Sequence, residues 1–172
     1  NMKAVFILLP WFAVVISQIK SEDCHPPDPV TVPKDQLIDI KWYIRASKPN
    51  IFNTYKGFIE IVSETQPGDR YTSITMYNGF TGSSGFWKFP NNAIKTTYDK
   101  KELSDLSGKF KILAFDEDLF ISQRAPKDDK EGLTLVRIKK KCLDQETRTK
   151  VEEALKKICL DPTDFSFDNS CK

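Results

Sequence analysis

From residue 40 to residue 141 the sequence repeats one local pattern, in which short runs rich in β-branched and aromatic residues alternate with turns. The turns lie at residues 66–69, Asn78-Gly79, 82–85 and Asp116-Glu117-Asp118, where the residue types favour tight backbone bends. The pattern predicts eight strands, at residues 40–46, 56–63, 70–77, 86–89, 93–99, 109–115, 119–124 and 133–141. Because connections this short cannot hold a crossover helix, each strand is expected to pair antiparallel with its neighbours along the chain.

A change of period after these strands predicts a single helix over residues 144–160. Asp144 is a suitable N-cap, Pro162 ends the helix, and an apolar stripe at helical spacing is expected to dock on the strands: Val151, Ala154, Leu155, Ile158 and Cys159. Residues 165–167 are compatible with a short ninth strand. The expected fold class is therefore all-β with one C-terminal α-helix, an eight-stranded antiparallel up-and-down β-barrel.

The first residues have the features of a secretory signal peptide. Lys3 precedes an apolar run over residues 4–16, and polar residues follow. We expect residues 1–21 to be cleaved, leaving a barrel domain over residues 22–172 in a secreted, extracellular protein. The apolar run is too short to span a bilayer comfortably and no other stretch is apolar enough, so no membrane span is expected.

Four cysteines, Cys24, Cys142, Cys159 and Cys171, lie in the expected mature chain. An even number in an oxidising compartment predicts two disulfides, for which three pairings are possible. The favoured pairing joins Cys24 to Cys142, tying the proline-rich N-terminal arm to the last long strand, and Cys159 to Cys171, tying the tail to the helix. The spacing contains no Cys-x-x-Cys motif and His25 is the only histidine, so no metal site is expected.

Trp42 lies near the start of the first long strand, directly after a single turn. A large ring in this position suits the closed bottom of a barrel, where its indole N–H needs a partner, although an ordinary core role also fits. The loop that follows the strand, residues 47–53, carries Ile51 and Phe52. These two side chains are expected to form either a lid over a cavity mouth or a staple onto the rim.

The order of these features resembles the lipocalin family over nearly the whole mature chain. Three motifs carry the resemblance. Ile40-Lys41-Trp42 matches the family's Gly-x-Trp without its glycine, Phe115-Asp116-Glu117 loosely matches Thr-Asp-Tyr, and Lys139 takes the place of a basic residue that lies over the tryptophan. Cys24-His25-Pro26-Pro27 and Lys41-Trp42-Tyr43-Ile44-Arg45 are similar to the insect (cockroach) members in particular. The resemblance implies a secreted barrel that binds a small hydrophobic molecule, with Trp42, Asp116 and Lys139 as structural motif residues.

The residue types do not form a recognisable catalytic centre. His25 lies in the proline-rich arm, and the carboxylates of Asp116, Glu117 and Asp118 lie on a turn, where solvated charges are ordinary. We therefore expect a non-enzyme with no cofactor, in the form of a monomer or weak homo-oligomer. The formal charge of +2 becomes about zero once Lys3 and Lys20 are removed, so no nucleic-acid partner is expected.

The barrel interior is the remaining candidate for a binding site. If Trp42 points inward, alternation along the strands, together with the facing that the lipocalin resemblance implies for the sixth and seventh strands, predicts an apolar lining with aromatic walls. The predicted ligand-binding residues are Ile44, Ile59, Ile61, Ile74, Met76, Trp87, Phe89, Tyr98, Phe110, Ile112, Ile121 and Leu135. The same pattern also fits a packed core without a cavity.

Two functions fit this interior. The first is carriage of a small hydrophobic ligand, such as a fatty acid, another lipid or a pheromone-like molecule. The second is a bulk secreted nutrient, storage (milk-type) or allergen-like protein whose lipid cargo is incidental. Scavenging of amines, as in salivary lipocalins, is a third function that would require inward carboxylates, and Glu60 is the one residue whose facing the alternation leaves ambiguous.

Overall fold

The computed structural model describes residues 24–171 apart from 26, 67–69, 91–92 and 127–131. The predicted signal peptide and most of the predicted turn at 66–69 lie outside the described residues. Among the helices that are described, none is long and apolar enough to cross a membrane.

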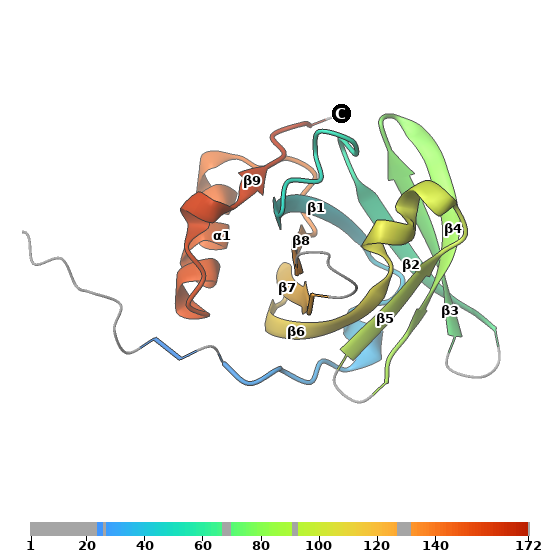
Figure 1. Cartoon of the computed structure of the whole chain (residues 1–172), viewed down its shortest axis with the longest axis horizontal. Helices are drawn as coiled ribbons and strands as arrows, with labels where there is room; N and C mark the ends of the chain where they lie inside the picture. The colour runs from blue at the N-terminus through green and yellow to red at the C-terminus, as the bar shows by residue number, and fades with distance from the viewer. Residues whose placement is uncertain (1–23, 26, 67–69, 91–92, 127–131, 172) are drawn as a thin grey trace, which may run out of the picture.

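One antiparallel sheet closes on itself to form a barrel (Figure 1), because β1 pairs with both β8 and β2. The strands are β1 (Lys41–Lys48), β2 (Ile59–Gln66), β3 (Arg70–Tyr77), β4 (Phe80–Lys88), β5 (Ala93–Tyr98), β6 (Gly108–Asp116), β7 (Leu119–Arg124), β8 (Leu133–Ile138) and β9 (Ser166–Phe167). The helices are α1 (Gln145–Lys157) and three 3-10 turns, η1 (Lys34–Gln36), η2 (Lys101–Leu106) and η3 (Pro162–Asp164). The predicted eight-stranded barrel with one C-terminal helix is confirmed. The short β9 pairs with the second half of β1.

The fourth strand is longer than its predicted span of residues 86–89. It starts at Phe80, and the segment that resembles a turn in the sequence pairs with β3, with Gly85 opposite Ser73. A Cβ atom on Gly85 would lie 2.4 Å from the carbonyl oxygen of Thr97, so only glycine fits here. The glycine therefore reflects close approach of the neighbouring strand, which sequence alone does not distinguish from a turn.

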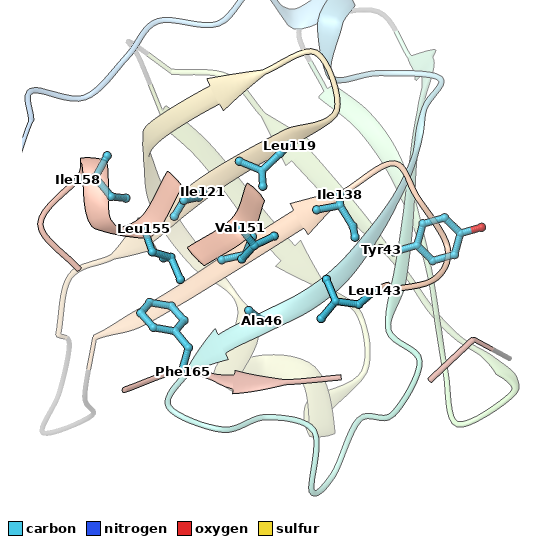
Figure 2. Packing of buried hydrophobic residues seen from close by; sticks show 11 residues of the cluster. Tyr43, Ala46, Leu119, Ile121, Ile138, Leu143, Val151, Leu155, Ile158 and Phe165 are labelled. Atoms are coloured by element: carbon cyan, nitrogen blue, oxygen red, sulfur yellow. The ribbon is translucent and has the colours of Figure 1, made fainter. Parts of the chain in front are cut away.

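Helix α1 covers the outer face of β1, β7 and β8. Asp144 caps the helix by accepting a hydrogen bond from the Thr147 amide at 2.9 Å. Figure 2 shows the apolar side of the helix directed toward the barrel wall, and the buried cluster consists of Tyr43, Ala46, Leu119, Ile121, Val136, Ile138, Leu143, Val151, Leu155, Ile158 and Phe165. Since successive residues of a strand face opposite sides, the neighbours of these strand residues point into the barrel.

The two disulfides join Cys24 to Cys159 and Cys142 to Cys171, so the favoured pairing is wrong. The N-terminal arm crosses β6, where the Val30 amide donates to the Ile112 carbonyl, and this path carries Cys24 to the end of α1. Sequence separations of 135 and 29 residues correspond to about 5 and about 3.5 kcal/mol on the chain-entropy model.

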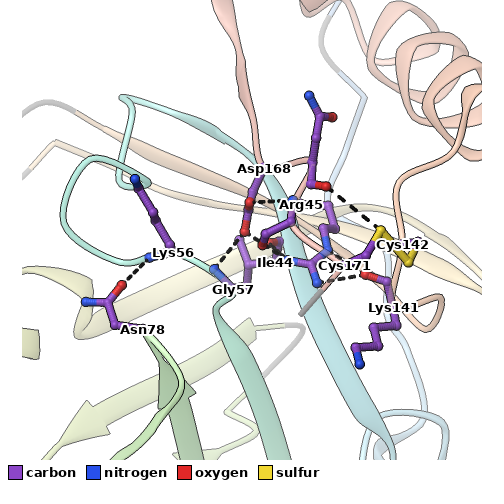
Figure 3. A network of polar contacts seen from close by, with 11 residues as sticks. Ile44, Arg45, Lys56, Gly57, Asn78, Lys141, Cys142, Asp168 and Cys171 are labelled. Atoms are coloured by element: carbon purple, nitrogen blue, oxygen red, sulfur yellow. Dashed lines mark hydrogen bonds and ion pairs between the residues drawn. A yellow bond between two sulfur atoms is a disulfide. The ribbon is translucent and has the colours of Figure 1, made fainter.

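The C-terminal tail is held by a buried ion pair next to the second disulfide (Figure 3). Arg45 Nη1 donates to Asp168 Oδ2 at 2.9 Å, while Arg45 Nε and Nη2 donate to the Lys141 carbonyl. Asp168 also accepts from the Gly57 amide at 2.8 Å. The Asp168 carboxylate thus connects β1, the loop before β2 and the tail.

We predict that Asp168→Ala lowers the free energy of unfolding by about 3 to 5 kcal/mol, because it leaves the buried Arg45 guanidinium without its counter-ion. Asp164→Ala is the matched control. It removes an ion pair to Lys48 in which both side chains are about half exposed (51% and 50%), and we expect a loss of about 0 to 1 kcal/mol. Urea denaturation measures both, and equal losses would show that the tail contact contributes no more than a surface pair.

Candidate functional site

One end of the barrel is closed by the region around Trp42. Its indole Nε1 donates to the Leu37 carbonyl at 3.0 Å, just after η1, and its ring packs edge-on against Phe120 at 4.8 Å between centroids. Lys139 Nζ lies 5.6 Å from the ring centroid. We call the buried set at this end the closed-end cluster: Leu37, Trp42, Val62, Tyr71, Trp87, Ile94, Ile112 and Phe120.

The opposite end is covered by the loop after β1 and by η2. Ile51 and Phe52 are buried there, in a set that we call the loop-end cluster: Ile44, Ile51, Phe52, Phe58, Tyr98, Leu103, Leu106, Phe110, Leu133 and Leu135. Tyr55 donates to the Glu102 carbonyl at 2.6 Å, and Tyr77 donates to the Glu102 carboxylate at 2.7 Å. The first bond ties the segment after β1 to η2 and the second ties β3 to η2, and the apolar loop residues are inserted into this end of the barrel.

A layer of polar side chains lies between the two clusters. Arg137 on β8 donates through Nε to Glu60 Oε2 at 2.6 Å and through Nη1 to Ser122 Oγ at 2.7 Å. Glu60 on β2 accepts a second, short hydrogen bond from the Tyr98 hydroxyl on its other oxygen. The Arg137 and Glu60 side chains are 1% and 0% exposed, so the barrel contains a fully buried ion pair.

Three aromatic rings surround the Arg137 guanidinium. The distances from its Cζ atom to the ring centroids are 5.1 Å for Phe120, 5.5 Å for Trp87 and 5.9 Å for Phe110. A guanidinium is weakly hydrated and binds well to aromatic faces, which offsets part of its desolvation. The rings come from both apolar clusters, so the ion pair links the two halves of the core.

Burial raises the pKa of Tyr98 well above its ordinary value, and the negative charge of Glu60 raises it further. Arg137 acts in the opposite direction but does not cancel the shift. Tyr98 is therefore a neutral hydrogen-bond donor at physiological pH, and it satisfies one oxygen of Glu60.

Three buried polar atoms on one wall of the barrel, Ser73 Oγ, Thr75 Oγ1 and Trp87 Nε1, have no hydrogen-bond partner among the described residues, and the same is true of Arg124 Nε on β7. The first three lie on the adjacent strands β3 and β4, where Ser73 faces Gly85 across the pair and Trp87 faces Tyr71. An unsatisfied buried polar group costs about 1 to 3 kcal/mol, so native proteins rarely keep several on one wall without a partner such as a ligand or water.

The structure places half of the predicted lining inside the barrel, namely Ile44, Trp87, Tyr98, Phe110, Ile112 and Leu135. It places the others differently. Ile121 packs against α1, Phe89 packs beside Tyr71 at the closed end, and four residues of β2 and β3 point outward: Ile59, Ile61, Ile74 and Met76. Ile74 is 44% exposed, and Ile59 and Met76 line an outer groove of about 770 Å³ with the C-terminal tail.

The largest group of errors lies on β2 and β3, where the prediction placed Ile59, Ile61, Ile74 and Met76 on the inner face. In the barrel Trp42 pairs with Glu60, and cross-strand partners point to the same face, so Glu60 is inside and its neighbours Ile59 and Ile61 are outside. Register between strands separated by a long loop has no local sequence signal. The inward residues Glu60, Ser73 and Thr75 were therefore missed as site residues. Ser122 was missed because its neighbour Ile121 was placed inside, and Arg137 was missed although its spacing from Leu135 on β8 gives both the same facing.

In the described part of the chain, no three His, Cys, Asp or Glu side chains gather in a way that would hold a metal ion. The motif residue Asp116 is exposed at the end of β6. His25 is exposed in the N-terminal arm. The polar layer inside the barrel is thus the part of the structure that offers defined chemistry to a small molecule.

No protein-family profile matches this sequence, and no curated protein sequence matches it. Solved structures do match its fold. The cockroach major allergen Per a 4 is 17% identical over 85% of this chain and 94% of that chain, with a TM-score of 0.60. Insecticyanin from the tobacco hornworm Manduca sexta is 15% identical over 85% and 86%, with a TM-score of 0.61. Japanin from Rhipicephalus appendiculatus, solved bound to cholesterol, is 15% identical over 79% and 93%, with a TM-score of 0.53.

We predict that Arg137→Met destabilises the protein by about 3 to 5 kcal/mol, because Glu60 is left buried without its counter-ion. The double variant Glu60→Gln, Arg137→Met should recover most of this loss, since it removes both charges together. Urea unfolding of the two variants at neutral pH makes the comparison. A double variant as unstable as the single one would mean that packing of the Arg137 stem, and not the ion pair, dominates.

We also predict that Thr75→Val raises the free energy of unfolding of ligand-free protein by about 1 kcal/mol, because it replaces an unsatisfied buried hydroxyl with a methyl group of similar size. Thr97→Val is the control on an exposed position of β5 and should change stability by less than about 0.5 kcal/mol. The measurement is urea unfolding after removal of lipids. A loss of stability in Thr75→Val would show that the hydroxyl has a partner.

Proposed function

We propose, from the lipocalin fold of this chain, that the protein is a secreted carrier that binds a small hydrophobic ligand inside the barrel. The observation that carries this proposal is the wall of unpartnered polar atoms on Ser73, Thr75 and Trp87, set among apolar side chains. A ligand with an apolar body and one polar group would supply the missing hydrogen bonds and still bury its body. The matched structures have the same fold, and one of them, Japanin, was solved bound to cholesterol.

Secretion is part of the proposal. It is supported by the signal-peptide pattern of residues 1–21 and by two disulfides in the chain, which are typical of oxidising compartments. The mature domain would then be residues 22–172.

A binding role is favoured over a catalytic one by the state of the buried groups. Both oxygens of Glu60 already accept hydrogen bonds, from Tyr98 and Arg137. Among the described residues the hydroxyls of Ser73 and Thr75 have no hydrogen bond to a base, and the Glu60 carboxylate, which lies opposite Thr75, is already occupied by Tyr98 and Arg137. These side chains can orient a ligand but are not arranged to react with it.

The ligand classes that fit the proposal are fatty acids, other lipids and pheromone-like molecules. The inner lining would consist of Ile44, Trp87, Tyr98, Phe110, Ile112 and Leu135, with the polar wall beside it. Access would require the loop that carries Ile51 and Phe52 to move away from η2, since these residues fill the loop end. Ile59, Ile61, Ile74 and Met76 are removed from the ligand-binding set because they face outward.

We predict that the delipidated protein binds the fluorescent probe N-phenyl-1-naphthylamine at one site per chain, and that Ser73→Leu weakens this binding by about tenfold or more by filling the inner wall. Thr97→Leu, on the outer face of β5, is the matched control and should bind as the unmodified protein does. Fluorescence titration measures both, with circular dichroism as the check on folding. Absence of probe binding, or equal binding by both variants, would contradict an interior site.

A further inference from the structure

The charges of the polar layer between the two apolar clusters are already balanced. Glu60 and Arg137 form a one-to-one ion pair, and Tyr98 is a neutral donor to it. Arg124, nearer the loop end, is partly exposed and donates through Nη1 to the carbonyls of Asp105 and Ser107, while its buried Nε has no partner among the described residues. A ligand that enters the polar layer between the two clusters, away from Arg124, therefore meets an ion pair with no net charge left to neutralise.

All three unpartnered groups on the β3–β4 wall can donate a hydrogen bond, so an acceptor would satisfy them. The indole N–H of Trp87 can only donate, and the hydroxyls of Ser73 and Thr75 can donate as well as accept. The three lie at successive positions along the β3–β4 pair, so a ligand oxygen beside any one of them would receive a hydrogen bond without taking a donor from the ion pair. The hydroxyl, carbonyl and ester groups have such an oxygen and carry no charge.

We infer that the barrel selects uncharged amphipathic ligands, meaning alcohols, ketones or esters on an apolar body, over carboxylates and amines of the same size. This inference rests on the proposed carrier function and narrows its ligand class. Its basis is that an ion pair whose charges compensate each other lies beside a wall whose hydrogen-bond donors have no partner among the described residues.

Anionic and cationic ligands are disfavoured for the same reason, which is that either one leaves a buried charge uncompensated. A carboxylate that approaches Arg137 would place two buried anions against one guanidinium, and an ammonium that approaches Glu60 would compete with Arg137 and leave its charge unpaired. An uncompensated charge in a low-dielectric interior costs far more than one hydrogen bond returns. A neutral oxygen incurs no such penalty.

The experiment compares five ligands of equal carbon number: 1-dodecanol, 2-dodecanone, dodecanoic acid, dodecylamine and dodecane. Each displaces N-phenyl-1-naphthylamine from the delipidated protein at neutral pH. We expect the affinity for the alcohol and for the ketone to exceed the affinity for the acid and the amine by a factor of about ten or more. It should exceed the affinity for the alkane by a factor of about five or more. Equal or tighter binding of the acid or the amine overturns the inference, and so does an alkane that binds as well as the alcohol.

Two variants test the wall itself. Thr75→Val and Trp87→Phe each remove one donor, and each should reduce the preference for dodecanol over dodecane, taken as the ratio of the two affinities measured on the same variant, by about threefold or more. Thr97→Val is the exposed control and should retain the full preference. If Thr75→Val does not fold, Trp87→Phe decides the question, and an unchanged preference in a folded variant overturns the inference.

The outcomes separate this inference from the function on which it rests. If the unmodified protein binds neither the probe nor any member of the series, the carrier proposal fails and the inference fails with it. If the probe binds and the acid or amine is preferred, the carrier proposal stands and only the inferred neutrality of the ligand is wrong.

Discussion

The buried ion pair between Glu60 and Arg137 is the constraint on which the barrel interior depends. A carboxylate and a guanidinium can leave water only if other groups compensate them, and here Tyr98, Ser122 and three aromatic rings do so. These partners come from β4, β5, β6 and β7, while the pair itself reaches from β2 to β8 across β1. Most strands of the barrel therefore contribute a side chain to this polar layer or to its immediate surroundings.

This layer makes the interior amphipathic. An apolar cluster closes each end, but the middle of the barrel holds a neutralised ion pair, and unsatisfied polar groups lie beside it, with Thr75 opposite Glu60 and the Trp87 ring next to Arg137. Packing alone would favour Val at position 75 and a residue without an N–H at position 87, since both changes remove an unpaired polar atom. Removing these polar atoms would thus stabilise the ligand-free protein, whereas the proposed ligand recognition requires them.

Local features of the fold were predictable because they depend on residues close in the chain. The apolar stripe with Val151 and Leu155 and the cap at Asp144 were sufficient to predict α1, and the turn at Asp116 to Asp118 separates β6 from β7 as expected. The candidate site was only half predicted. Ile44, Phe110 and Leu135 follow from the facing of Trp42, but Ile59 and Ile74 were placed on the wrong side of their strands.

The sequence by itself determined the order and type of the elements, the barrel that short antiparallel connections require, and the even number of cysteines. Tertiary structure alone decided which cysteines pair and which face of β2 is inside. Cys24 meets Cys159 because the arm runs across β6, and Glu60 points inward because it pairs with Trp42 and finds Arg137 on β8. Turns and periodicity are set within a few residues, whereas strand register and the burial of a charge depend on partners that only the closed barrel brings together.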